Sequence, residues 1–236
     1  MRETLEIKVI ARIRTDFPEK FGIPRQSGLV DSLKGTIVFE PEYRDPQALK
    51  GLEAFSRLWL IWEFSGAKRD TWSATVRPPR LGGNTRMGVF ATRSPFRPNP
   101  LGLSCVRLLG VERDPNLGTV LLVGGADLMD GTPILDIKPY LPFADSYPDA
   151  AGGFAADVFD HSLAVEFPGK LLEKVAEEKR EALLSVLAQD PRPSYQNDPD
   201  RVYGMTFAGY GVRFTVDGAR LFVREVRTPE EEKKRV

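Results

Sequence analysis

The amino-acid sequence predicts a mainly β fold with a smaller α+β part at its C-terminal end. Short apolar stretches with strand-like patterns are separated by turns rich in Gly and Pro, without amphipathic helices between them, which favours an antiparallel barrel or sandwich over a doubly wound sheet. Helical spacing begins only near Phe167. We therefore expect a large domain over residues 1–165 and a small helix-and-hairpin domain over residues 166–236.

The first domain contains a succession of predicted strands. Strict alternation of apolar and polar residues over 5–13 predicts a strand with one buried face. The stretch 55–64 is almost continuously apolar and aromatic, which predicts a central strand or a short buried helix leading into one. Four further strands are expected at 34–40, 87–92, 101–112 and 119–123. The last two are joined by RDPNLG, which is typical of a turn.

The C-terminal domain combines a predicted helix with a hairpin. Apolar residues recur at helical spacing from Leu171 to Leu187, and Asp190-Pro191 ends the run. After a polar loop, VRFTVDGARLFVREV predicts a hairpin around Asp217-Gly218. The G-x-G in GYGVRF precedes strand-like alternation, so we interpret it as a hairpin feature and not as a dinucleotide fingerprint. The tail TPEEEKKRV is expected to be solvated and frayed.

Several classes of protein are excluded by composition. A single cysteine, Cys105, rules out an intrachain disulfide and a Cys-based metal cluster, and favours a reducing cytoplasm. The one histidine, His161, makes a zinc site or a Ser-His-Asp triad unexpected, and we place it at the surface or a domain junction. No apolar run has the length of a signal or membrane-spanning segment. We expect a cytoplasmic protein without a metal.

Arginine is concentrated in one segment of a chain whose net charge is zero. Between Asp70 and Glu112 there is no acid and no Lys, although a stretch of that length should carry about six acids. Its arginines are Arg77, Arg80, Arg86, Arg93, Arg97 and Arg107. Arg without Lys favours forked recognition of phosphate or carboxylate, and neighbouring prolines predict stiff loops that lose little entropy on binding. We interpret the segment as an anion site; for any one arginine, pairing with a distant carboxylate is an equal alternative.

Five segments together resemble one protein family. They are KFGIPRQSG, VRPPRLGGN, GVFATRSPFRPNPLGLS, DGTPILDIKPYLPFADS and QDPRPSY. With them, nearly the whole chain resembles the TsaA-like, or TrmO-type, tRNA methyltransferases. The resemblance implies a homodimeric β-barrel enzyme that uses S-adenosylmethionine to methylate the exocyclic nitrogen of threonylcarbamoyladenosine beside the anticodon. No spacing in this chain indicates the methyl donor by itself.

The same resemblance implies a set of donor-binding residues. They are Pro24, Arg25, Gln26, Ser65, Gly66, Arg93, Leu103, Asp130, Gly131, Thr132 and Pro133. These side chains are of the required types: Asp130 accepts hydrogen bonds from amino groups, Arg25 or Arg93 pairs with a carboxylate, and Leu103 provides an apolar wall. Read alone, Asp-Gly-Thr-Pro is also ordinary turn chemistry.

The resemblance also implies contacts with the tRNA anticodon arm. The candidates are Arg77, Arg80, Arg97, Asn99 and Tyr195, with Arg192 as a further possibility. Phosphate contacts position RNA, while stacking and hydrogen bonds read an exposed base. Phe96, Tyr140 and Tyr195 are candidate stacking residues, each of which can equally belong to the core.

Methyl transfer requires the removal of one proton from the substrate nitrogen. Because a purine and a carbamoyl group both delocalise the charge of that nitrogen, a strong base is not obligatory. Asp136, or another carboxylate of the acidic stretch 127–160, is the candidate acceptor. Two alternatives stay open: a methyltransferase that uses S-adenosylmethionine on a non-RNA substrate, which zero net charge favours, and a non-catalytic module that binds RNA or another anion.

Overall fold

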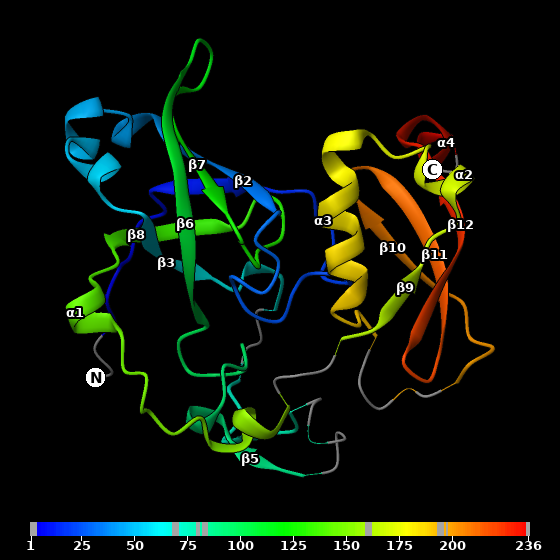
Figure 1. Cartoon of the computed structure of the whole chain (residues 1–236). Coiled ribbons are helices and arrows are strands. Elements are labelled where there is room, and N and C mark those ends of the chain that lie inside the picture. Colours follow the sequence, from blue (N-terminus) through cyan, green and yellow to red (C-terminus); the bar gives the residue numbers. More distant parts are fainter. Residues whose placement is uncertain are drawn as a thin grey trace.

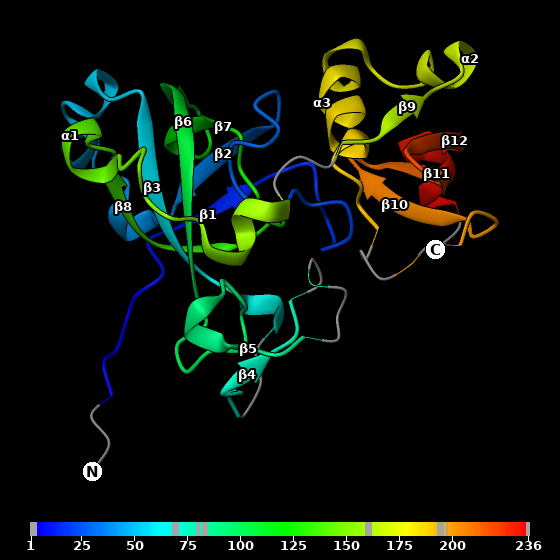
Figure 2. The same cartoon turned by 60° about the horizontal axis from the view of Figure 1, so that its bottom comes forward.

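The computed structural model describes residues 4–67, 71–78, 81, 85–158, 162–192, 196 and 198–234. Six strands form a closed barrel in the order β1-β2-β7-β6-β3-β8, and β8 pairs back onto β1. A lobe containing β4 and β5 projects from one end of this barrel, and a four-stranded sheet lies beside it (Figures 1 and 2). The expected mainly β fold with a C-terminal α+β part is confirmed.

The barrel strands pair antiparallel throughout. Their bounds are β1 Ala11–Arg14, β2 Lys34–Phe39, β3 Arg57–Glu63, β6 Leu101–Asp114, β7 Gly118–Gly124 and β8 Pro133–Pro139. Strand β3 is hydrogen-bonded on both sides, to β6 and to β8, as expected for its dense apolar sequence. Its alternate residues Leu58, Leu60 and Trp62 are buried inside the barrel. Side-chain alternation along the strands thus builds the first core.

Three expectations for the first domain are wrong in detail. Leu5 and Ile7 are exposed, and β1 begins only at Ala11, where its pairing with β2 reaches the last residue of that strand, Phe39, and its pairing with β8 stops at Ile134. Within the expected strand 87–92, residues 89–91 form a 3-10 turn. Strand β8 was not expected, since a proline stands at each of its ends.

Short elements connect the barrel strands. The lobe contains β4 Thr75–Val76 and β5 Met87–Gly88, paired with each other. Helix α1 spans Pro142–Asp145. The 3-10 turns are η1 Pro41–Tyr43, η2 Pro46–Leu49, η3 Leu52–Ala54, η4 Ser65–Ala67, η6 Val89–Ala91 and η7 Gly153–Val158. Within the described ranges, no helix is both long and apolar enough to cross a bilayer.

The C-terminal sheet has the order β10-β11-β12-β9. Its strands are β9 Ala164–Glu166, β10 Tyr203–Phe207, β11 Tyr210–Asp217 and β12 Arg220–Arg227. The hairpin around Asp217-Gly218 is confirmed, and Gly209, at φ +82°, lies in the turn between β10 and β11. Strand β9 runs parallel to β12, so the expected boundary between residues 165 and 166 falls inside a strand of this sheet.

Two helical expectations for the second domain need correction. The apolar run from Leu171 to Leu187 forms two helices, α2 (Gly169–Leu172) and α3 (Glu177–Ala188), and not one. The tail is not wholly frayed, because Pro229–Lys233 form helix α4. This short helix begins with a capping box, in which the Thr228 hydroxyl accepts from the Glu231 N–H and the Glu231 carboxylate accepts from the Thr228 N–H.

A second hydrophobic core joins the two halves of the chain. Helix α3 and strands β10 to β12 supply most of it, but Phe17, Val30 and Leu33 come from the long connection between β1 and β2. The Phe17 ring packs edge-on against Phe207, with centroids 5.4 Å apart. The connection that follows β1 is therefore anchored in the C-terminal domain.

We predict that Phe17→Ala destabilises both parts of the molecule together. Phe17 is 1% exposed, so its truncation should lower the free energy of unfolding by about 3–5 kcal/mol. Tryptophan fluorescence reports on the first domain, which contains Trp59, Trp62 and Trp72, while circular dichroism reports on the whole chain. Both urea midpoints should fall together. Phe143→Ala, at a site 88% exposed, should change stability by less than about 0.5 kcal/mol. A shift of only one probe would contradict the shared core.

Candidate functional site

A cavity of about 540 Å³ opens at one end of the barrel. Its walls come from the last residues of β3, the first residues of β6, and the connection between β7 and β8, which meet at this end because the strands are antiparallel. The connection between β1 and β2 and part of the lobe complete it. The lining residues are Lys20, Ile23, Pro24, Arg25, Gln26, Trp62, Glu63, Phe64, Ser65, Gly66, Thr92, Arg93, Pro95, Arg97, Leu101, Gly102, Leu103, Asp127, Leu128, Met129 and Thr132.

The loop that carries Pro24 to Gln26 is held at several points. The Gly28 N–H donates to the Gly125 carbonyl at 2.9 Å, and the Cys105 N–H donates to the Ser27 hydroxyl at 3.0 Å. Arg25 Nη2 donates to the backbone carbonyl of Arg192 at 3.0 Å. The loop is thus tied to β6, to the connection after β7 and to the C-terminal domain, which fixes the cavity wall before any ligand binds.

Trp62 forms an apolar wall whose position depends on a glycine. A Cβ placed on Gly102, its neighbour on β6, would lie 2.2 Å from the Trp62 ring, so only glycine leaves room for the indole there. The indole also packs against Phe64, with ring centroids 4.3 Å apart. Leu103 adds a side chain that is 49% exposed at the cavity. This wall suits the apolar part of a ligand.

Asp127 is a carboxylate in the cavity that is linked to Trp62 by hydrogen bonds. Trp62 Nε1 donates to the Ser104 hydroxyl at 2.9 Å, and that hydroxyl donates to Asp127 Oδ1 at 2.6 Å. Burial raises the pKa of Asp127 above its ordinary value, although the bond from Ser104 and the nearby charge of Arg93 act in the opposite direction. A carboxyl with a raised pKa in a cavity is a candidate for proton transfer.

Cationic side chains surround the same cavity. Arg93 Nη1 donates to the Gln26 side-chain oxygen, and Lys20 Nζ donates to the Gly66 carbonyl. Arg25 and Arg97 also line the walls. Against these four cations stand two carboxylates, those of Glu63 and Asp127. The cavity can therefore hold a ligand that carries both an anionic group and an apolar part.

Most of the residues expected to bind the donor lie together in this cavity. They are Pro24, Arg25, Gln26, Ser65, Gly66, Arg93, Leu103 and Thr132. Asp130, Gly131 and Pro133 do not line it. Asp130 Oδ1 accepts from the Thr15 N–H at 2.9 Å, and the Gly131 carbonyl accepts from Arg12 at 3.2 Å. These two residues join the start of β8 to β1, as expected of turn chemistry.

The carboxylate expected to accept a proton lies elsewhere. Asp136 is on β8 outside the cavity lining, accepts from the Ile137 N–H, and forms an ion pair with Lys138 at 2.9 Å. In the sequence, Asp127 stands out only as the first member of an acidic stretch. The one sequence signal for its burial was its position between two apolar residues, Ala126 and Leu128, and both are buried in the structure.

The arginine segment divides into three groups. Arg93 and Arg97 line the cavity, and Arg77 is exposed on the lobe, as is Asn99 just before β6. Two others make contacts within the fold: Arg86 donates to Thr75 at 2.8 Å, and Arg107 to the Asp31 carbonyl at 3.0 Å. Arg80, Tyr195 and His161 lie outside the described residues.

Arg192 is not available to a ligand. It is 7% exposed and forms a forked ion pair with Asp190, at 2.9 and 3.0 Å. The backbone of Asp190 has φ +50°, which places both side chains of the pair in the same tight turn. Arg192 thus has a structural role in this turn, which disfavours the hypothesis that it contacts tRNA.

The exposed aromatic residues of the lobe are not the expected stacking residues. Phe96 and Tyr140 are half-buried, and Tyr140 packs on Trp59. By contrast, Trp72 and Phe90, 52% and 73% exposed, stack on each other on the lobe, with centroids 6.3 Å apart. Such an exposed pair offers a flat surface to an unstacked base.

The fold and the cavity define a mainly β protein whose closed barrel carries a cofactor-sized site at one end. Residues 12–146 match the family model of the tRNA-methyltransferase O N-terminal domain, and residues 160–229 match that of the TrmO C-terminal domain. The chain belongs to the TrmO family of tRNA methyltransferases. The resemblance found in the sequence is thereby confirmed.

Individual relatives agree with this assignment. The chain is 43% identical over 234 residues to the tRNA (adenine(37)-N6)-methyltransferase of Escherichia coli K12, covering 95% of this chain and 99% of that protein. It is 44% identical over 210 residues to a putative S-adenosylmethionine-dependent methyltransferase, RcsF, of Pseudomonas aeruginosa, covering 86% and 88%. A crystal structure of TrmO from P. aeruginosa superposes with a TM-score of 0.79 at 36% identity, covering 97% and 99%.

We predict that Gly102→Ala damages the cavity. The added methyl group would meet the Trp62 ring, and displacement of that ring would break its hydrogen bond to Ser104. Binding of S-adenosylmethionine, measured by calorimetry, should weaken at least tenfold, and the stability should fall by about 1–3 kcal/mol. Gly110→Ala is the matched control, because a Cβ on Gly110, in the same strand, meets nothing within 4 Å. Equal donor affinity in both variants would show that the Trp62 wall does not serve the ligand.

Proposed function

We propose that this protein transfers a methyl group from S-adenosylmethionine to the exocyclic N6 nitrogen of threonylcarbamoyladenosine at position 37 of tRNA, beside the anticodon. Family membership supports the reaction class, and the relative from E. coli is named for methylation of that adenine. The observation that carries the proposal is the joint placement of cations, an apolar wall and the Asp127 carboxylate in one cavity. No group of three or more His, Cys, Asp or Glu side chains in the described part of the chain is arranged to hold a metal ion.

The cavity residues fit the methyl donor by chemical type. Arg93 or Arg25 would hold the donor carboxylate, and Leu103 with Trp62 would face its apolar portion. Ser65, Thr132 and the Gly66 backbone would supply polar contacts. S-adenosylmethionine supplies the electrophilic methyl group when bound. The protein's part is then to align the substrate nitrogen, exclude water and accept one proton.

In this proposal Asp127, and not Asp136, accepts the proton of the substrate nitrogen. Asp127 lines the cavity and is oriented by the Ser104 hydroxyl, which is in turn fixed by Trp62. Its raised pKa makes it a better base than an ordinary carboxylate. Because the attacked nitrogen is acidified by its two neighbours, a carboxylate of this kind is a sufficient acceptor.

The anticodon arm would lie over the lobe. Arg77, Arg80 and Asn99 would contact its backbone, and Arg97, at the cavity, would pair with the threonyl carboxylate of the modified base. Tyr195 would lie beside the RNA. A homodimer would double this small cationic footprint on a neutral protomer at no cost in sequence. We divide the chain into a methyltransferase domain that ends near residue 165 and a C-terminal domain that follows it. The protein would work in the cytoplasm.

The decisive experiment compares tRNA that carries the threonylcarbamoyl group with tRNA that lacks it. Methyl-labelled donor should transfer label only to the modified tRNA. Arg93→Ala should abolish micromolar donor binding, because the variant loses a cation of the cavity wall that would pair with the donor carboxylate, while Arg77→Ala should leave donor affinity unchanged and weaken tRNA binding. Label that appears on proteins or small molecules, with none on tRNA, would favour the non-RNA substrate. RNA binding without any transfer of label would favour the non-catalytic module.

We predict that Asp127→Asn lowers kcat about a hundredfold with little change in donor affinity. A carboxylate accepts a proton only when ionised, so the wild-type rate should rise with pH through the pKa of Asp127, at a pH above the ordinary value of about 3.9. That limb of the profile should be absent in the variant. Asp136→Asn, outside the cavity, is the control and should keep the wild-type profile. A loss of donor affinity with kcat intact at saturation would make Asp127 a donor ligand instead.

A further inference from the structure

A second cavity, of about 620 Å³, lies in the C-terminal domain and shares no residue with the first. It is lined by Leu171, Lys174, Arg213, Arg224, Glu225, Val226, Arg227, Glu231 and Lys234. We refer to these residues as the C-terminal groove. Five of its side chains are cationic and two are acidic, in a chain with no net charge.

The groove lies on the side of the sheet that α3 does not cover. Val212 and Phe214 of β11 and Val223 and Val226 of β12 point into the core shared with α3. Since side chains alternate along a strand, Arg213 points to the opposite face. A bulge where the pairing shifts between Arg213 and Phe214 re-aims the neighbouring side chains of β12.

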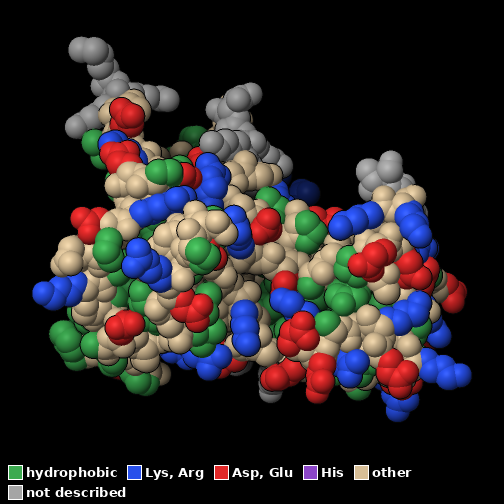
Figure 3. All heavy atoms as spheres, turned by 90° about the horizontal axis from the view of Figure 1, so that it is seen from above, with side chains coloured by type: hydrophobic (Ala, Val, Ile, Leu, Met, Phe, Trp, Pro, Cys, Tyr) green, Lys and Arg blue, Asp and Glu red, His purple; other side chains and the backbone are tan. Residues whose placement is uncertain are grey.

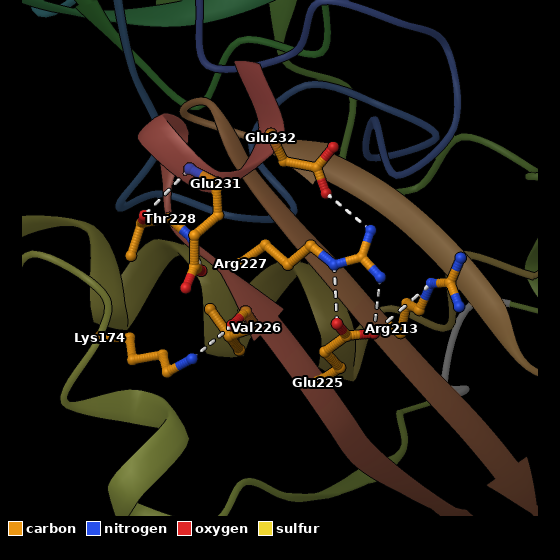
Figure 4. A network of polar contacts seen from close by, with 8 residues as sticks. All are labelled: Lys174, Arg213, Glu225, Val226, Arg227, Thr228, Glu231 and Glu232. Atoms are coloured by element: carbon orange, nitrogen blue, oxygen red, sulfur yellow. Dashed lines mark hydrogen bonds and ion pairs between the residues drawn. The ribbon is translucent and has the colours of Figure 1, made fainter. Parts of the chain in front are cut away.

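The two acidic side chains of the groove are already engaged. Glu225 accepts a forked pair of hydrogen bonds from Arg227, at 2.7 and 3.2 Å, and Arg213 approaches the same carboxylate at 3.8 Å (Figure 4). Glu231 caps the N-terminus of α4 through the Thr228 N–H. Two guanidinium groups thus share one carboxylate within the groove, and Arg227 has an additional contact with Glu232 at 3.5 Å.

Two further cations of the groove, Arg224 and Lys174, have neutral contacts. Arg224 is exposed, donates to the Thr215 hydroxyl at 3.1 Å and lies 5.2 Å from the Phe222 ring centroid. Lys174 donates to the Val226 carbonyl at 3.1 Å. Lys234 is exposed after α4 and interacts electrostatically with Glu230, which does not line the groove. The contacts of Arg224 and Lys174 neutralise no positive charge, so the groove keeps an excess of cations around an open, polar space.

We propose that the C-terminal groove binds phosphates of the tRNA backbone. The inference rests on the proposed function for the identity of the RNA. Forked guanidinium groups match phosphate geometry, and an anion with several oxygens can satisfy two arginines that now share one carboxylate. On the face of the C-terminal domain seen in Figure 3 (right), acidic and basic side chains are interspersed. The groove is therefore a local contact for backbone phosphate and not part of a broad basic face.

The test removes Arg213 and Arg224 together, because Arg227 is needed by its neighbours. The double variant Arg213→Ala, Arg224→Ala should bind tRNA at least fivefold more weakly, and the slope of log affinity against log salt should fall by about 1 for each lost contact. The KM for tRNA should rise while kcat at saturation and donor affinity stay unchanged. Replacement of both by Lys should restore most of the binding, since Lys also pairs with phosphate.

The control is Lys50→Ala, Arg113→Ala, which removes the same charge from two exposed barrel residues that line neither cavity. If this control and the groove variant bind tRNA alike, at the same salt slope, the groove is not an RNA site, although methyl transfer to tRNA would still support the proposed function. If the wild type binds tRNA through the groove but transfers no methyl group, the proposed function fails and the groove stands. Loss of poly-glutamate binding, with tRNA binding intact, would assign the groove to an acidic protein and overturn the inference.

Discussion

The pairing of β8 with both β1 and β3 is the constraint on which the rest of the molecule depends. It closes the barrel, and it also fixes the connection between β7 and β8, which contains Asp127. Hydrogen bonds from Thr15 to the Leu128 carbonyl and to Asp130 fasten that connection to the residues after β1. Without closure, the walls of the cavity would come from strand ends that have no fixed distance from one another.

The arginine segment shows how charge segregated along a sequence is redistributed by folding. Arg107 is used to hold Asp31, and Arg86 to hold the lobe, while Arg93 and Arg97 reach the cavity. The sequence allowed two roles for these arginines, an anion site and contacts within the fold, and each role is taken by some of them. The absence of acids from the segment matters because only Glu63 and Asp127, which lie outside the segment, oppose the four cations that line the cavity.

Sequence patterns predicted the strands that have a paired strand on each side and whose side chains are alternately buried. Examples are β3, β6 and the hairpin of β11 and β12. They failed where the neighbouring strand decides whether a segment becomes a strand. Leu5 and Ile7 have a strand pattern but no strand beside them. Strand β8 forms although it carries a helix- and strand-breaking proline at each end. For the site, recognisable motifs selected residues for donor binding, and most of these lie together in one cavity. Asp127 could not be chosen among seven similar acids, because its burial beside Trp62 and Ser104 exists only in the closed barrel.

The hydrogen bond between Arg25 and the Arg192 carbonyl links the donor cavity to the C-terminal domain. The forked pair with Asp190 fastens Arg192 within its turn, and the carbonyl of the same residue accepts from the guanidinium of Arg25 at the cavity wall. One wall of a cavity in the barrel is thus positioned in part by a turn of the other domain. The barrel by itself would lack this contact, so the C-terminal domain contributes to the shape of a cavity that it does not line.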